Sequence, residues 1–130
     1  MKLAIAGASG RMGRMLIEAA LTAPDMTVAA ALDQPGSAHV GEDCAAFLGR
    51  TSGTRISADI NAIAVCDVLI DFTRPEGTLT HLPACVRHGV KAVIGTTGFD
   101  EAGRAAIRDA AQNVGVVFAP NMSVGVNATF

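Results

Sequence analysis

Short, continuous apolar runs recur along the chain and are separated by longer segments of mixed polarity. A strand that is covered on both faces carries such a run, because neither set of its alternating side chains meets water. The intervening segments are long enough for helices, which parallel strands need as right-handed crossovers. We therefore predict an α/β fold, a doubly wound parallel sheet with helices on both faces. The predicted strands are Leu3–Ala6, Val28–Leu32, Val68–Ile70, Ala92–Ile94 and Val116–Phe118.

The segments between these runs carry helix signals. A helix over Arg11–Ala23 would stop before a proline. Thr73–Glu76 has the form of a capping box, and the helix that it starts would end at Gly89. Asp100 is placed to cap a third helix, which we expect to end near Gly115.

Two segments depart from this pattern. Pro83 falls inside the second predicted helix, where it removes the N–H that would bond to the carbonyl of Leu79. We therefore predict a kink or an early end of that helix. Gln34–Arg55 is rich in Gly, Ser and Thr, which predicts a long loop with one weak helical turn before a marginal strand near Ile56.

The first predicted strand runs directly into a glycine-spaced turn and then into a helix. Gly10 and Gly13 would let the backbone approach a phosphate and let the helix pack on the strand. Unpaired N–H groups at the start of the helix would face the anion. Ala8 takes the first position of a G-x-G-x-x-G fingerprint, with an additional Gly7 before it. The pattern predicts a binding site for the pyrophosphate of a dinucleotide.

An acidic residue stands where such a fold places its ribose ligand. Asp33 follows the second apolar run and lies 20 residues after Gly13. At that spacing an acid accepts hydrogen bonds from the adenosine ribose hydroxyls. The alternative is a loop acid before the turn Gln34–Gly36. The strand, turn and helix around it favour the ribose role and a Rossmann-like sheet.

Composition excludes several classes of function. The 130 residues make one domain, and a net charge of −2 with a pI near 5.8 argues against nucleic acid or an anionic membrane as a partner. No apolar segment reaches the roughly 18 residues of a membrane span. Cys44, Cys66 and Cys85 are widely spaced and form no CxxC pair. We expect buried thiols, no disulfide, no metal site and a cytoplasmic location.

Ligands of an open parallel sheet bind at the carboxyl ends of its strands, so the residues that follow each run are the candidates. Gly95–Gly98 could lie beside a nicotinamide carboxamide or form a plain strand-to-helix loop. Asp71 and Arg74 could pair with each other or cap a helix. Arg11 is equally suited to a phosphate or adenine contact and to a solvated surface position.

The sequence shows no acid–base pair at these strand ends. The chain has three histidines, and we interpret each as a surface or helix C-terminal residue. They are His39, His81 and His88.

Four motifs, taken together and in order, give the chain a family likeness. It resembles 4-hydroxy-tetrahydrodipicolinate reductase of bacterial lysine and diaminopimelate biosynthesis, over that family's amino-terminal, nucleotide-binding domain. The motifs are Gly7-Ala-Ser-Gly-Arg-Met-Gly13, Asp71-Phe-Thr-Arg-Pro-Glu-Gly77, Val93-Ile-Gly-Thr-Thr-Gly-Phe99 and Asn121-Met-Ser-Val-Gly-Val-Asn127.

The resemblance implies a set of cofactor-binding residues: a pyrophosphate turn, an acidic ribose ligand, a loop near the nicotinamide and a segment that closes on the cofactor. Many relatives place an arginine after the ribose acid, whereas this chain has Gln34, so NADH is favoured over NADPH. The expected residues are Gly7, Ala8, Ser9, Gly10, Arg11, Met12, Asp33, Gln34, Phe72, Gly95, Thr96, Thr97, Ala119, Pro120, Asn121 and Met122.

The resemblance also implies an activity. The parent enzyme would transfer a hydride from NADH or NADPH to a dihydrodipicolinate-type substrate and give tetrahydrodipicolinate. We expect residues 1–127 to form the NAD(P)-binding domain and 128–130 to begin a substrate and oligomerisation domain. The family's catalytic histidine pair, lysine and substrate-binding loop would then lie beyond residue 130, as would the site for the dicarboxylate heterocycle, and the parent enzyme would be a homo-oligomer.

Two rival functions are open to test. One is a stand-alone dinucleotide-sensing module without catalysis, which fits the same turn and ribose acid. The other is a dehydrogenase with a cysteine nucleophile, which is disfavoured because no cysteine follows a predicted strand. The resemblance favours the reductase, with a chain that binds dinucleotide but is inactive when isolated.

Overall fold

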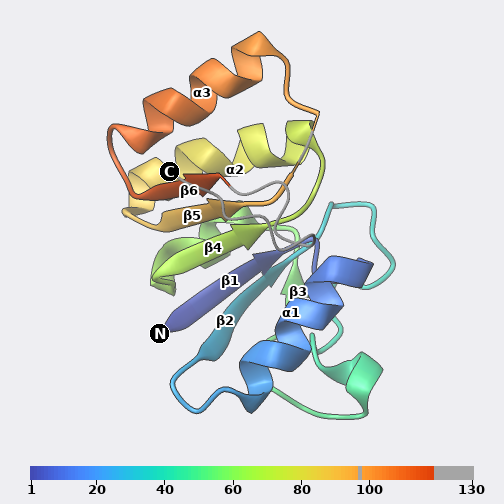
Figure 1. Cartoon of the computed structure of the whole chain (residues 1–130). Coiled ribbons are helices and arrows are strands. Elements are labelled where there is room, and N and C mark those ends of the chain that lie inside the picture. The colour runs from blue at the N-terminus through green and yellow to red at the C-terminus, as the bar shows by residue number, and fades with distance from the viewer. Residues whose placement is uncertain (97, 119–130) are drawn as a thin grey trace.

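A computed structural model describes residues 1–96 and 98–118 of the chain. Within them six parallel strands form one sheet in the order β3-β2-β1-β4-β5-β6 (Figure 1). This order is that of a Rossmann fold, so the predicted fold class is confirmed. The strands are β1 (Lys2–Ala6), β2 (Thr27–Leu32), β3 (Ile56–Ser57), β4 (Val68–Asp71), β5 (Lys91–Ile94) and β6 (Val116–Phe118).

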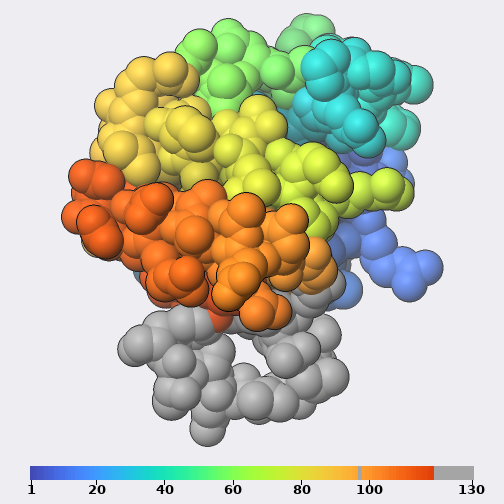
Figure 2. Space-filling model, turned by 90° about the horizontal axis from the view of Figure 1, so that it is seen from above, coloured from blue at the N-terminus to red at the C-terminus, as the bar shows by residue number. Residues whose placement is uncertain are grey.

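Helices cover both faces of the sheet. Helix α1 (Arg11–Thr22) lies on one face. Helices α2 (Pro75–His88) and α3 (Glu101–Ala111) lie on the other, together with the 3₁₀ helix η2 (Ile60–Val65). Figure 2 shows α3 and α2 side by side on the surface of that face.

The two faces of β1 point into two separate cores. Leu3 and Ile5 pack with Ile17 of α1, whereas Ala4 and Ala6 belong to the core beneath α2 and α3. This division follows from the alternation of side chains along a strand. Small alanines on the second face let the helices approach the sheet closely.

The segment between β2 and β3 is held by one carboxylate. Asp43 accepts hydrogen bonds from the backbone N–H groups of Ala45, Ser52 and Gly53 at 2.9–3.0 Å. These bonds, the one from Ala45 first, lower the pKa of Asp43 to about 2. The weak helical turn predicted here is present as the 3₁₀ helix η1 (Ala46–Leu48), and the marginal strand is β3.

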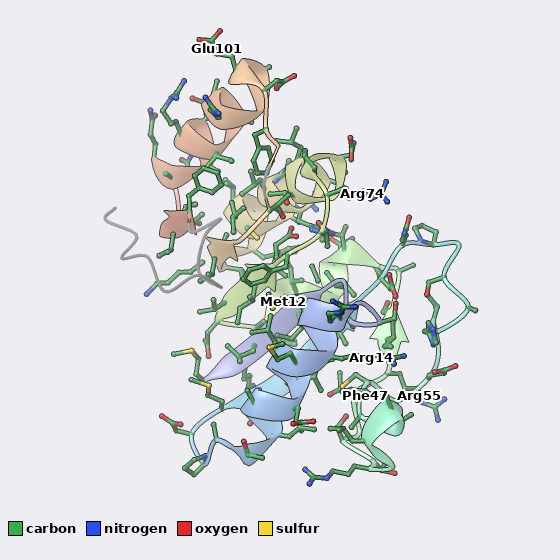
Figure 3. All side chains as sticks on the ribbon, turned by 45° about the vertical axis from the view of Figure 1, so that its right-hand side comes forward. Met12, Arg14, Phe47, Arg55, Arg74 and Glu101 are labelled. Atoms are coloured by element: carbon green, nitrogen blue, oxygen red, sulfur yellow. The ribbon has the colours of Figure 1, made fainter. Side chains whose placement is uncertain are left out.

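An aromatic side chain attaches this segment to the first helix. The guanidinium of Arg14 on α1 lies 5.1 Å from the ring centre of Phe47 in η1 (Figure 3). A cation over the face of an aromatic ring is attracted by the ring's quadrupole. The contact therefore helps to hold the loop against α1.

Helix α2 differs from its prediction in two respects. Its N-cap residue is Arg74, not Thr73, because the Thr73 hydroxyl donates to the Asp71 carboxylate at 2.6 Å instead. The early end predicted at Pro83 is wrong, since the helix continues to His88. Leu82 and Cys85 are buried on either side of the proline, and this packing compensates for the missing hydrogen bond.

The ends of α2 and α3 and the cysteines largely follow the sequence prediction. Gly89 closes α2 in the left-handed region, with a φ of 69°. Asp100 caps α3 by accepting from the N–H of Gly103 at 2.8 Å, but α3 ends at Ala111, earlier than predicted. The three cysteines are buried free thiols, as expected. Within the described residues no helix is long and apolar enough to cross a membrane.

Candidate cofactor site

The glycine turn joins β1 to α1 through one left-handed residue. Gly7 has a φ of +75°, a conformation that a residue with a Cβ rarely adopts. The N–H groups of Gly7 and Ala8 both donate to the carbonyl of Leu32 at 2.9 Å, which fixes the turn against β2. The sharp bend therefore belongs to Gly7, which explains why alanine is accepted at the next position.

Helix α1 packs directly on this turn. A Cβ on Gly13 would lie 2.1 Å from the carbonyl oxygen of Gly7, so only glycine fits. The N-cap is Gly10, which has no side chain to bond the first turn, and α1 has no acidic residue there. Among the described residues none accepts from the N–H groups of Arg11 and Met12. These donors and the helix dipole are the groups that the predicted anion site requires.

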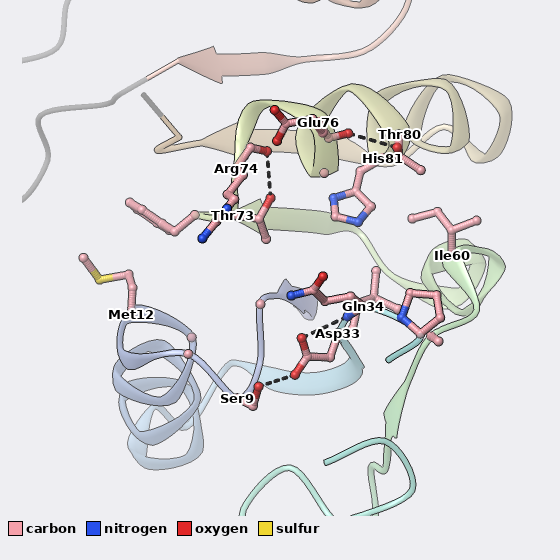
Figure 4. Close-up of a pocket in the computed structure, with 18 of the residues that line it drawn as sticks. Ser9, Met12, Asp33, Gln34, Ile60, Thr73, Arg74, Glu76, Thr80 and His81 are labelled. Atoms are coloured by element: carbon pink, nitrogen blue, oxygen red, sulfur yellow. Dashed lines mark hydrogen bonds between the residues drawn. The ribbon is translucent and has the colours of Figure 1, made fainter. Parts of the chain in front are cut away.

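Asp33 closes the site at the end of β2. Its carboxylate accepts from the hydroxyls of Ser9 and Ser37 and from the N–H of Gln34 (Figure 4). Ser9 is part of the glycine turn, so Asp33 and this turn lie side by side. This is the arrangement that binds an adenosine ribose next to a pyrophosphate.

A cavity of about 620 Å³ opens between α1 and α2 at the carboxyl ends of β1, β2 and β4. Its size is that of a small-molecule site. Met12 faces into it from α1, and Arg74 and His81 face into it from α2 (Figure 4). Eight of the sequence-predicted site residues line it: Gly7, Ser9, Gly10, Arg11, Met12, Asp33, Gln34 and Phe72.

The other predicted site residues lie elsewhere or are not described. Ala8 is buried beneath the turn. Gly95 and Thr96 follow β5 and do not line this cavity; the Thr96 hydroxyl instead donates to the Asp71 carbonyl at 3.4 Å. The remaining predicted residues lie outside the described residues: Thr97, Ala119, Pro120, Asn121 and Met122.

Sequence reasoning missed a carboxylate–histidine pair in the cavity wall. Asp71 is 1% exposed at the end of β4, and its Oδ2 lies 2.6 Å from Nδ1 of His81 on α2. The surface interpretation of His81 is therefore wrong, as is the absence of an acid–base pair at the strand ends. Gly77, four residues earlier, is on the same face of α2, and this small residue was the available signal that the face meets the strands.

Asp71 is ionised in this arrangement. Burial alone would raise the pKa of its carboxyl, but hydrogen bonds from His81 and Thr73 and the charge of the histidine outweigh burial and lower that pKa. An ionised Asp71 requires His81 to donate through Nδ1–H. Of the two uses considered for Asp71 and Arg74, mutual pairing is not formed, whereas Arg74 is the N-cap residue of α2, without a side-chain capping bond. His88, by contrast, contacts Asn61 and does not line the cavity.

The cavity carries charges of both signs. Arg11 and Arg74 bring positive charge to its walls, and Asp33 and Glu76 bring negative charge. In the part of the chain that the structure describes, no group of three or more His, Cys, Asp or Glu side chains could hold a metal ion. The site therefore offers hydrogen-bond donors and guanidinium groups, which suit a phosphorylated organic ligand.

Comparison with known proteins assigns this chain to a family. A family model described as the N-terminus of dihydrodipicolinate reductase matches residues 1–122. The chain belongs to the dihydrodipicolinate reductase family. The 4-hydroxy-tetrahydrodipicolinate reductase of Cupriavidus metallidurans is 64% identical over 131 residues, and that of Bordetella pertussis is 62% identical over 128. The matches cover 100% and 98% of this chain but 49% and 48% of the relatives, so this reductase domain spans about half their length.

Solved structures agree on the fold of this dihydrodipicolinate reductase domain. A dipicolinate-bound dihydrodipicolinate reductase from Paenisporosarcina sp. TG-14 superposes with a TM-score of 0.74 at 25% identity, covering 96% of this chain and 49% of that one. GenD2 from gentamicin A biosynthesis, solved in complex with NAD, has a TM-score of 0.71 at 16% identity and covers 93% of this chain and 34% of that one. The second likeness shows the fold alone.

Proposed function

We propose that this domain binds the dinucleotide cofactor of a 4-hydroxy-tetrahydrodipicolinate reductase. The observation that carries the proposal is the cavity at the switch point of the sheet, which is lined both by the first residues of α1 and by Asp33. A pyrophosphate would bind at those donors, and the adenosine ribose hydroxyls would bond to Asp33. The expected contacts beyond the described residues, Thr97 and Ala119–Met122, belong to the same proposal.

The reaction proposed for the whole enzyme is hydride transfer from NAD(P)H to a dihydrodipicolinate-type substrate in lysine and diaminopimelate biosynthesis. The cofactor supplies the hydride, and this domain supplies its binding and orientation. Groups that hold and protonate the substrate would come from the half that the relatives have in addition. We therefore expect the 130-residue chain to bind the dinucleotide without reducing the substrate, because nothing holds the two at reacting distance.

We propose further that the site prefers NADH to NADPH. The carboxylate of Asp33 lies where the ribose hydroxyls are expected, and it would repel a 2′-phosphate. The next residue, Gln34, is neutral, so it adds no positive charge to offset that repulsion.

The test is a calorimetric titration of this chain with NADH and NADPH in parallel. We expect saturable binding of both, tighter for NADH, and about tenfold weaker NADH binding in Asp33→Ala, because charge-assisted hydrogen bonds to the ribose are lost. Asp109→Ala is the matched control, since Asp109 is an exposed acid on α3, away from the cavity. A folded chain that binds neither dinucleotide would refute the proposal.

A further inference from the structure

The cavity contains an ionisable side chain, His81, to which the proposed cofactor contacts assign no role. His81 projects from α2 into the cavity toward Gln34 and Asp33 (Figure 4). Its side chain is 16% exposed, so the ring is held in place. Nδ1 bonds to Asp71, and Nε2, at the other edge of the ring, has no hydrogen-bond partner among the described residues.

The two protonation states of His81 present opposite chemistry at Nε2. Because the ionised Asp71 holds the proton on Nδ1, a neutral ring offers a lone pair at Nε2, which repels a phosphate. A protonated ring offers an N–H and a positive charge, which attract one. Histidine is the side chain whose charge ordinarily changes between about pH 5 and 8.

Other charged groups also border the cavity. Asp33 faces His81 from the end of β2, and Glu76 lies on its own helix. Arg11 of α1 and Arg74 at the N-cap of α2 are cations throughout this pH range, so they contribute a constant attraction. Asp71 of β4 stays ionised. His81 is the imidazole among the groups that line the cavity.

We propose that His81, oriented by Asp71, is a specificity-determining residue that admits a 2′-phosphate at the adenosine end of the cavity when its ring is protonated. The inference rests on the proposed function and deepens it. Asp33 and Gln34 set the discrimination against NADPH, and a protonated His81 ring weakens it by supplying the cation that Gln34 lacks. When NADPH is bound, Nε2 carries a proton, and this N–H donates a hydrogen bond to the 2′-phosphate.

The first experiment measures the Kd of NADH and NADPH at pH 6 and pH 8.5. For the wild-type chain we expect the preference for NADH to fall by about tenfold at the lower pH, the effect of one charge-assisted hydrogen bond. In His81→Gln we expect a change of less than about threefold. The 2′-phosphate of the free dinucleotide also titrates, near pH 6, and this contribution is the same whichever variant is measured. His88→Gln is the matched control, since this histidine is on the same helix outside the cavity, and it should behave as the wild type does.

A second experiment needs no substitution at His81. The chain has three histidines, so the ring signals of His81 can be assigned by NMR with His39→Gln and His88→Gln. At pH 7 we expect NADPH to move the His81 signals toward the protonated form and NADH to leave them near their free positions. This experiment remains decisive if His81→Gln does not fold.

The outcomes separate the two proposals. Wild-type binding of both dinucleotides, with an unchanged preference across pH and no selective response of the His81 signals, overturns the role of His81 and leaves the proposed function standing. A folded wild-type chain that binds neither dinucleotide overturns both. A pH-dependent preference that persists in folded His81→Gln assigns the effect to another group and overturns the inference alone.

Discussion

Gly95 lies directly beneath the ring of Phe72, so closely that a Cβ on the glycine would stand 1.9 Å from Cε1 of the phenylalanine. The two residues follow neighbouring strands, β5 and β4. The contact explains a glycine that sequence analysis assigned either to a nicotinamide contact or to a plain strand-to-helix loop. A glycine is needed at position 95 because the ring of Phe72, which lines the cavity, leaves no room for a side chain there.

We predict that Gly95→Ala destabilises the chain by about 1–3 kcal/mol, because an added methyl forces the ring to move. Urea unfolding measures this cost. In a Phe72→Ala background the obstacle is absent, so the same substitution should cost less than about 0.5 kcal/mol. Equal costs in both backgrounds would show that the ring is not the obstacle.

Gly13→Ala should be more damaging than Gly95→Ala. Its methyl would meet the backbone carbonyl of Gly7, which no side-chain rotation can relieve. We expect a loss of about 3 kcal/mol or more and a loss of dinucleotide binding, measured by thermal unfolding and calorimetry. Gly36→Ala is the matched control, because a Cβ there meets nothing within 4 Å. A Gly13→Ala chain as stable as Gly36→Ala would refute the close packing of α1 on the turn.

The carboxylate of Asp43 should make the fold sensitive to acid. Its pKa is lowered from 3.8 to about 2 in the folded chain, so its stabilising effect is complete above about pH 4 and is lost as the pH falls toward 2. After allowance for solvent screening, the contribution is about 1 kcal/mol. Asp43→Asn should therefore lower the Tm by a few degrees at pH 7 and have a much smaller effect at pH 2.5.

Glu42→Gln serves as the control for that experiment. Glu42 is the neighbouring acid, and its carboxylate contacts the exposed His39. We expect its Tm to follow that of the wild type at both pH values. An equal response of the two variants would indicate a general charge effect instead of the loop network around Asp43.

The three thiols should be inert in the folded chain. Burial, followed by the charge of Asp71, raises the pKa of Cys85 to about 12, and burial also raises the pKa of Cys44 and Cys66. At pH 8 the thiolate of Cys85 is then present at about one part in ten thousand. Reaction with a disulfide reagent should proceed only as fast as the chain unfolds, and three thiols should react at once in denaturant. Rapid labelling of one thiol in the folded chain would contradict this burial.

The sequence was sufficient for the sheet because each buried strand carries its own apolar run, which does not depend on the rest of the chain. The turn of Gly7–Gly13 and the acid Asp33 are likewise local signals, and the structure places them along one cavity. The pair of Asp71 and His81 is different. It depends on the rotation of α2 above β4, which no short stretch of sequence specifies.

Local rules failed where tertiary contacts compete with them. Thr73 has the residue type of an N-cap, but a buried carboxylate two residues earlier takes its hydroxyl. Pro83 should end a helix, but side chains on both sides of it are buried in the core beneath α2, and the helix continues to His88. The 3₁₀ helix η2 was not predicted, because its six residues are too few to show a helical period.

The position of β1 between β2 and β4 governs the order in which the chain can fold as it is synthesised. Leu3 pairs with Val28 on one side and with Val68 on the other. The first strand can thus find one neighbour early, while its second edge stays open until residues 68–71 have left the ribosome. Throughout that interval a row of unsatisfied backbone groups is available to other nascent chains. Slow translation across the segment from Gln34 to Arg55 would lengthen this exposure and should increase aggregation during synthesis, although the finished domain would be unchanged.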